Sequence, residues 1–232
     1  MLAAALSMGL LGVPVGAYLP GVIERVPAGE PALVGPGAWT RRPDRPRTLP
    51  IVLLTAVVFA LLGARFGFSA ELPAFLYGAA VGIALAVIDL IHHRLPNALT
   101  LPSYVIAGAL LGLAALVRGD GAAMLRALAG LAVLYALYYL LMLIYPAGMG
   151  FGDVKLAGVL GLYLGWLGWA ELAIGGFLGF LIGALAGLGL MATRRANRKS
   201  ALPFGPSMLL GALVAVLAGP AIADWYLGGI GG

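Results

Sequence analysis

The sequence predicts an all-α protein, a polytopic membrane bundle of about eight transmembrane helices. Of its 232 residues, 62% are hydrophobic and only 10% are charged, whereas a soluble domain carries about 25% charged residues. Apolar runs near the length of about 20 residues that crosses a bilayer core recur along the chain, separated by short polar or glycine-rich turns. So few charges cannot cover a surface exposed to water, which favours a membrane protein.

Eight apolar segments follow one another in order. They are expected at residues 1–23, 49–64, 72–91, 97–117, 122–145, 153 to about 167, 171–191 and 203–227. The first has no basic region before it and no clear cleavage site, so it is expected to be a retained span. Residues 24–48 form a polar, Pro-rich loop that is too short to build its own core. The chain 1–232 is therefore predicted to be a single membrane-embedded domain.

The basic residues predict the topology. The odd-numbered loops hold Arg25, Arg41, Arg42, Arg45, Arg47, Arg94, Lys155, Arg194, Arg195, Arg198 and Lys199. The even-numbered loops hold only Arg65, Arg118 and Arg126. Because cytoplasmic loops are enriched in Lys and Arg, the odd loops, including 24–48, are predicted in the cytoplasm and both termini outside. The net charge of +5 is then explained by topology and anionic lipid, and no nucleic-acid partner is expected.

Two aspartates lie at the predicted cytoplasmic ends of spans. Asp89 ends the third span and Asp153 begins the sixth, so we expect them at a similar depth. An acidic side chain in a membrane helix is costly and usually faces the bundle interior or a water-filled cavity. The helix dipole disfavours the anion at Asp89 and favours it at Asp153. Two carboxylates in one site share a proton, and such a pair can activate water against a peptide bond.

The turn before Asp153 is rich in glycine. Gly148, Gly150 and Gly152 allow backbone conformations that are closed to other residues. They would let an extended substrate strand lie close to the site and pair through backbone hydrogen bonds. A second interpretation stays open, since an aspartate after glycine at a helix start is also typical of an N-cap.

Other polar groups have simpler interpretations. Lys155 suits a positive-inside anchor, and Pro203 suits a helix start. The tyrosines of the fifth span, among them Tyr138, are expected to pack. The chain has no cysteine and only two histidines, His92 and His93, so no metal site is expected.

These motifs resemble those of the type IV prepilin peptidases, membrane aspartic proteases with a Gly-x-Gly-Asp motif. Asp89 followed by Pro96-Asn97 is similar to the family's first motif, and the segment from Gly150 to Lys155 is similar to its second. Leu202 to Pro206 resembles a late Pro-Phe-Gly-Pro segment. The catalytic candidates are thus Asp89 and Asp153. The candidate substrate-binding or site-shaping residues are Pro96, Asn97, Gly148, Gly150, Gly152, Lys155, Pro203, Phe204 and Gly205.

The resemblance implies removal of the basic leader peptide from type IV prepilins and pseudopilins at the cytoplasmic face of the inner membrane. Larger members of the family carry a cysteine-containing cytoplasmic domain after the first span and methylate the new N-terminus with S-adenosylmethionine. Here that loop is short and has no cysteine. No cofactor is expected for peptide cleavage, and S-adenosylmethionine only if methylation is retained. The expected partners are a prepilin or pseudopilin and membrane lipid, and the oligomeric state stays open.

Two rival functions remain. One is a presenilin-like protease that cuts within the bilayer. The other is an ion-coupled transporter that uses Asp89 and Asp153 as proton or cation sites. The transporter predicts internal symmetry between the two halves, and the sequence has no clear repeat.

Overall fold

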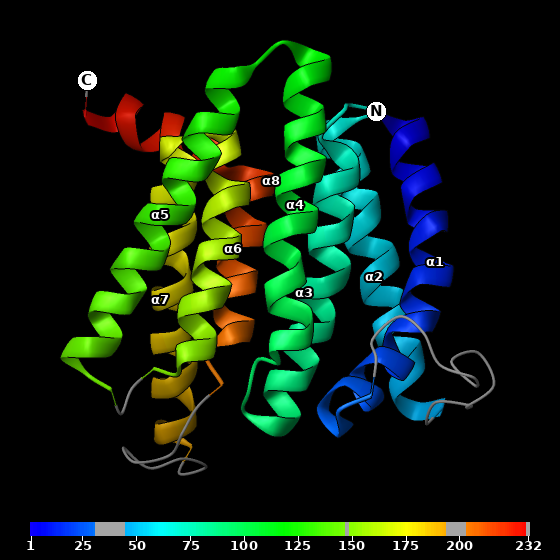
Figure 1. Cartoon of the computed structure of the whole chain (residues 1–232), viewed down its shortest axis with the longest axis vertical. Coiled ribbons are helices and arrows are strands. Elements are labelled where there is room, and N and C mark those ends of the chain that lie inside the picture. Colours follow the sequence, from blue (N-terminus) through cyan, green and yellow to red (C-terminus); the bar gives the residue numbers. More distant parts are fainter. Residues whose placement is uncertain (31–44, 147–148, 194–202, 231–232) are drawn as a thin grey trace. The chain divides into compact units, whose positions relative to one another are not determined.

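A computed structural model of the chain describes residues 1–30, 45–146, 149–193 and 203–230 (Figure 1). This part forms eight α-helices and one short 3-10 helix, without any strand, which confirms the predicted all-α class. The chain divides into two compact units, Met1–Gly119 and Asp120–Gly232. Each unit is described by itself below, and the single-domain organisation stays a prediction.

The first unit holds four α-helices, whose ends lie close to those expected. They are α1 (Leu2–Arg25), followed by the 3-10 turn η1 (Val26–Ala28), α2 (Arg45–Phe66), α3 (Leu72–His92) and α4 (Asn97–Arg118). The helix α2 begins at Arg45 rather than near residue 49, although its candidate membrane span is Thr48–Phe66, so 24–48 as the loop between the first two spans stays a prediction. Pro46 explains the earlier start, because proline is favoured in the first turn of a helix.

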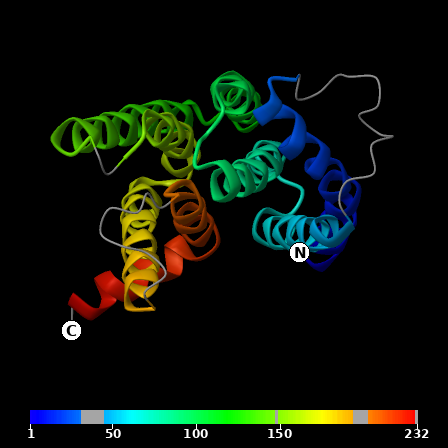
Figure 2. The ribbon, with the colours of Figure 1, turned by 90° about the horizontal axis from the view of Figure 1, so that it is seen from below.

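The helices α1 and α2 pack backbone to backbone, and Figure 2 shows them side by side. A Cβ atom added to Gly12 would lie 2.6 Å from the Cα of Ala56, and one added to Gly63 would lie 2.5 Å from the carbonyl oxygen of Ala4. Glycine at these positions therefore permits the close approach that is typical of membrane helix pairs.

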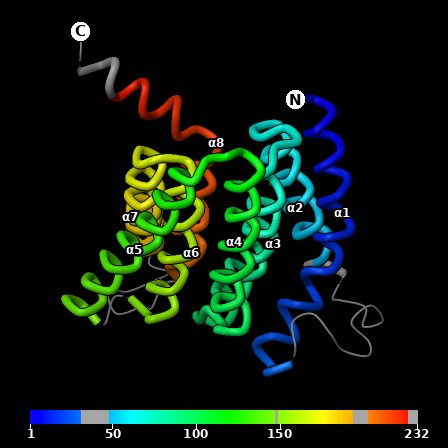
Figure 3. Tube along the Cα trace, turned by 45° about the horizontal axis from the view of Figure 1, so that its top comes forward, coloured from blue at the N-terminus to red at the C-terminus, as the bar shows by residue number. Residues whose placement is uncertain are grey.

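The second unit also holds four α-helices, drawn from green to red in Figure 3. They are α5 (Gly121–Ile144), α6 (Phe151–Leu167), α7 (Trp169–Ala192) and α8 (Gly205–Ile230). The pair α5–α6 again meets through glycine, because a Cβ on Gly130 would lie 2.5 Å from the carbonyl oxygen of Gly161 and 2.9 Å from the Cα of Gly165. The helix α6 also contacts α7 and α8.

Among the described residues, seven helices are long and apolar enough to cross a membrane, as expected of a multi-pass membrane protein. The helix α6 is the exception with 17 residues, a length of about 26 Å against a core of about 30 Å. Most of its side chains from Val154 to Trp166 are buried in the protein. The side of the membrane on which each terminus lies stays a prediction.

Candidate active site

Asp89 lies in the last turn of α3, with its side chain only 4% exposed. The helix ends there because His93 adopts a left-handed conformation with φ of 50°, and its N–H donates to the carbonyl oxygen of Asp89 at 2.8 Å. Pro96 is extended and Asn97 opens α4, so the predicted break between the two spans is confirmed. Asp89 thus lies at the helix end where the dipole disfavours a negative charge.

The turn after Asp89 is anchored to the end of α1. The Nη2 atom of Arg94 donates to the carbonyl oxygen of Pro27 in η1 at 2.9 Å, and Leu95 is buried beside it in sequence. Further along, the hydroxyls of Tyr77 and Ser103 lie 3.2 Å apart and join α3 to α4. The candidate residues Asp89, Pro96 and Asn97 therefore lie on one braced helix–turn–helix segment.

Asp153 is the third residue of α6 and is half-buried. Its Oδ2 atom accepts the backbone N–H of Gly150, the N-cap residue, at 3.0 Å. This is half of a capping box, and glycine has no side chain to complete the other half. The carboxylate thus contributes to capping its own helix from the third helical position, but Gly150 is the N-cap residue, so the interpretation of Asp153 as the N-cap is wrong. Its position at a helix N-terminus favours the anion.

The remaining candidates of the second unit flank this helix start. Gly152 is the second residue of α6, and the ammonium of Lys155 lies 4.6 Å from the ring centroid of Phe151, a cation–π distance. Gly148 lies outside the described residues.

Phe204 packs the start of α8 against α5 and α7. Its ring centroid lies 6.3 Å from that of Tyr138 on α5 and 5.3 Å from that of Phe180 on α7. A Cβ on Gly183 of α7 would lie 2.6 Å from the Phe204 ring, so glycine leaves the room that this ring occupies. Pro203 and Gly205 flank Phe204 at the beginning of α8.

Tyr138 is a residue that sequence reasoning assigned to packing alone. Its side chain is 2% exposed and lies against the rings of Phe180 and Phe204. The sequence offers no signal that distinguishes Tyr138 from Tyr135 and Tyr139 on the same helix. The second unit thus gathers Tyr138, Phe180 and Phe204 from three different segments. The convergence of Asp89 with Asp153 stays a prediction, because the two residues belong to separately described units.

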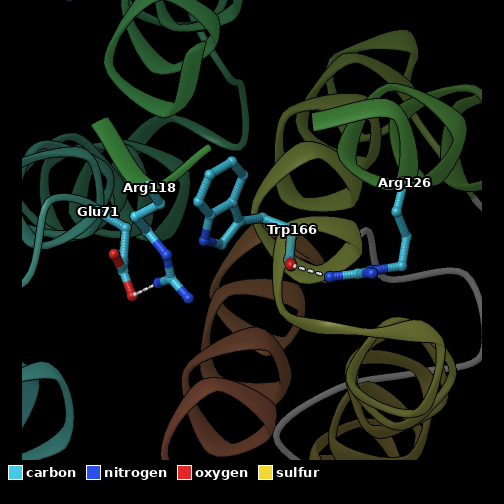
Figure 4. Close-up of polar contacts among 4 residues, drawn as sticks. All are labelled: Glu71, Arg118, Arg126 and Trp166. Atoms are coloured by element: carbon cyan, nitrogen blue, oxygen red, sulfur yellow. Dashed lines mark hydrogen bonds and ion pairs between the residues drawn. The ribbon is translucent and has the colours of Figure 1, made fainter. Parts of the chain in front are cut away.

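Each helix that carries an aspartate is anchored at its other end, and Figure 4 draws both anchors. At the start of α3, the buried carboxylate of Glu71 accepts a hydrogen bond from Nη1 of Arg118, which lies at the end of α4. At the end of α6, the Nε atom of Arg126 donates to the carbonyl oxygen of Gly165 at 2.9 Å, and Nη2 donates to that of Trp166 at 2.7 Å. These carbonyls have no partner within the helix, so Arg126 satisfies them and complements the dipole.

The segments that hold the two aspartates also match known proteins. The model of the type IV leader peptidase family matches residues 76–232. The prepilin leader peptidase/N-methyltransferase of Aeromonas hydrophila is 37% identical over 146 residues, which cover 62% of this chain and 49% of that protein. The proteins with the same name from Legionella pneumophila and Bacillus subtilis (strain 168) are 33% and 34% identical over 75% of this chain, and 60% and 67% of their own lengths are covered. The chain thus spans between half and two thirds of the length of these relatives. No solved structure matches it.

Proposed function

The chain belongs to the type IV leader peptidase family, and on this premise we propose that it is a membrane aspartic endopeptidase. Its proposed substrates are type IV prepilins and pseudopilins, from which it removes the basic leader peptide at the cytoplasmic face of the inner membrane. The observation that carries the proposal is the setting of the two aspartates in the family-matched segment. One is buried at the end of a helix and the other begins a helix.

The proposed mechanism uses the opposite helix ends. Asp89, at the end where the dipole opposes an anion, holds the shared proton and polarises the scissile carbonyl. Asp153, at the end where the dipole favours an anion, takes a proton from water. The water oxygen then bonds to the carbonyl carbon, the C–N bond breaks, and the departing amine receives a proton from the pair.

The start of α6, with Gly150 as its N-cap and Gly152 in its first turn, is the proposed place for the substrate backbone. Gly150 and Gly152 have no side chains to block an extended strand, which can then lie close to Asp153. Peptide bonds inside a helix are shielded by their own hydrogen bonds, so the leader junction must be unwound for cleavage. Backbone pairing along the turn would hold it in that form.

The test is co-expression with a candidate prepilin, followed by mass spectrometry of the prepilin. Wild-type protein should remove the leader, whereas Asp89→Asn and Asp153→Asn should each leave the precursor intact while remaining in the membrane fraction. Asp120→Asn is the matched control, because Asp120 caps α5 by accepting the N–H of Ala123 at 2.9 Å, and asparagine caps equally well. Processing by either of the first two variants at the wild-type rate would refute the two-aspartate mechanism.

The same spectrum separates the rival functions. A presenilin-like protease would cut a plain single-span substrate within its apolar segment, whereas a prepilin peptidase cuts at the leader junction. A transporter would cut neither and would instead carry ions into liposomes. Peptide cleavage is proposed to need no cofactor. A mass increase of the new N-terminus by one methyl group would reveal a methyl transfer that requires S-adenosylmethionine.

A further inference from the structure

The turn between α3 and α4 holds one residue in a strained backbone conformation, directly beside a proposed catalytic acid. His93 has a φ of 50°, a conformation that is costly for a residue with a side chain and persists only where its surroundings impose it. The His93 side chain is exposed, so burial of the imidazole does not hold it there. The N–H of His93 donates to the carbonyl oxygen of Asp89 at 2.8 Å, which ties the strained residue to the backbone of Asp89.

The far end of this turn is fixed to α4. The carbonyl oxygen of Pro96 accepts the N–H of Leu99 at 3.1 Å, the N–H of Thr100 at 3.2 Å and the hydroxyl of Thr100 at 2.7 Å. Leu95 is buried, with only 8% of its surface exposed. The turn is therefore held from Leu95 onward by burial and by α4, whereas Arg94 and the strained residue before it need another support.

Arg94 connects the turn to a different helix. Its Nη2 atom donates to the carbonyl oxygen of Pro27 at 2.9 Å, across 67 residues of sequence. The acceptor belongs to the 3-10 turn η1, in which Val26 is 5% exposed and its carbonyl oxygen accepts the N–H of Gly29 at 3.1 Å. The proline ring also restricts the backbone of Pro27, so this carbonyl is presented from a rigid turn.

The residue before η1 holds this turn to α1. Arg25 is 7% exposed, its Nη2 atom donates to the hydroxyl of Tyr18 at 3.3 Å, and its guanidinium carbon lies 5.6 Å from the centroid of the Tyr18 ring, a cation–π distance. The carbonyl oxygen of Arg25 accepts the N–H of Glu30 at 3.1 Å. The end of α1 is thus a fixed point against which Arg94 can hold the end of α3.

Resting on the proposed function, we propose that Arg94 is a positioning residue for the peptidase reaction. By binding the Pro27 carbonyl it keeps His93 in the left-handed conformation, and through the hydrogen bond from His93 to Asp89 it sets the last turn of α3 and the direction of the Asp89 carboxylate. Asp89 is 4% exposed, so a small rotation of this turn changes what the carboxylate faces. A misplacement of about 1 Å at a reacting group can cost a large factor in rate.

The first test measures cleavage of a purified prepilin by Arg94→Met, which removes the donor and keeps an unbranched apolar stem. We expect kcat to fall about five-fold, the loss of one hydrogen bond, with KM unchanged because Arg94 does not hold the substrate. Arg94→Lys, which keeps a charged donor, should have a kcat between those of Arg94→Met and the wild type. Arg65→Met is the matched control, since it removes the same group in the last turn of α2, and its kcat should equal that of the wild type. Wild-type kcat in Arg94→Met, or a change confined to KM, would overturn the proposal.

A second measurement does not depend on cleavage. The N–H of His93 exchanges with solvent only when its hydrogen bond to Asp89 opens. Arg94→Met should therefore speed hydrogen exchange at His93, measured in detergent at single-residue resolution, by about five-fold, while Arg65→Met should not. Equal exchange in the wild type and both variants would refute the role of Arg94. If the wild type leaves every prepilin intact, the proposed function fails, and the exchange rates still decide whether Arg94 holds the turn beside Asp89.

Discussion

The helices α3 and α6 each carry one candidate aspartate, yet their charges are arranged in opposite ways. In α6 two charges agree with the dipole, because Asp153 lies at the N-terminal end and Arg126 binds the C-terminal carbonyls, and only Lys155, in the second turn, opposes it. In α3 only Glu71, at the start, agrees with the dipole, and Asp89 lies buried at the wrong end. The comparison indicates that α6 is arranged for stability as well as chemistry, whereas Asp89 is retained against the stability of its helix.

The largest expected effects are those of substituting the two aspartates. Asp153→Asn and Asp89→Asn should both lower cleavage by about 1,000-fold or more, as the loss of a central catalytic group does. Their effects on stability should differ in sign. Asp153→Asn should lose about 0.5 kcal/mol, because asparagine can still accept the N–H of Gly150 but no longer complements the helix dipole, whereas Asp89→Asn should be neutral or stabilising. Thermal unfolding in detergent measures the difference, and equal destabilisation by both would contradict the comparison.

The next effect concerns the contact that holds α6 against α5. In Gly161→Ala the added methyl group would meet the carbonyl group of Gly130 and lie 2.9 Å from the Cα of Leu131. Because backbone atoms cannot move aside like side chains, we expect a loss of about 3 kcal/mol and reduced cleavage. Gly112→Ala on α4 is the control, since no atom of the described residues outside its own stretch of helix lies within 4 Å of its added Cβ. A wild-type unfolding temperature in Gly161→Ala would show that the two helices are free to separate.

Arg118 and Arg126 should differ in whether a second substitution can restore the stability that is lost with the arginine. Arg126→Gln should cost about 2 kcal/mol, because two charge-assisted hydrogen bonds to backbone carbonyls are lost. Arg118→Gln should cost about 1 kcal/mol, since Arg118 is 46% exposed and its pair with Glu71 is screened by solvent. Glu71→Gln should restore stability in the Arg118→Gln background but have no such effect with Arg126→Gln. Unfolding of the single and double variants measures this coupling.

The smallest effect is expected at the end of α3. His93 is the only non-glycine residue with a positive φ among the described parts of the chain, and a side chain in this conformation costs about 1 kcal/mol. His93→Gly should therefore raise stability by up to about 1 kcal/mol. His92→Gly is the control, because His92 is helical and glycine should destabilise it. The opposite order of unfolding temperatures would show that the left-handed turn stores no strain.

The sequence predicted the helices well, because apolar length and turn residues are local signals. Pro96 and the glycines before Asp153 marked the end of α3 and the start of α6 within a few residues. The contacts between helices had no such local signal. Arg126 reaches a carbonyl that is 39 residues away, and Tyr138 differs from Tyr135 and Tyr139 only in what its helix face meets. The short length of α6 was visible in the sequence, but its burial among α5, α7 and α8 was not.

The hydrogen bond from Arg94 to Pro27 has a practical consequence for fragment design. The family-matched region begins at residue 76, so the donor lies inside it and the acceptor lies outside. The helix α3 also contacts both α1 and α2. A protein trimmed to the homologous region would therefore lose the bracing of the turn beside Asp89, and its inactivity would say nothing about the chemistry of the residues it keeps.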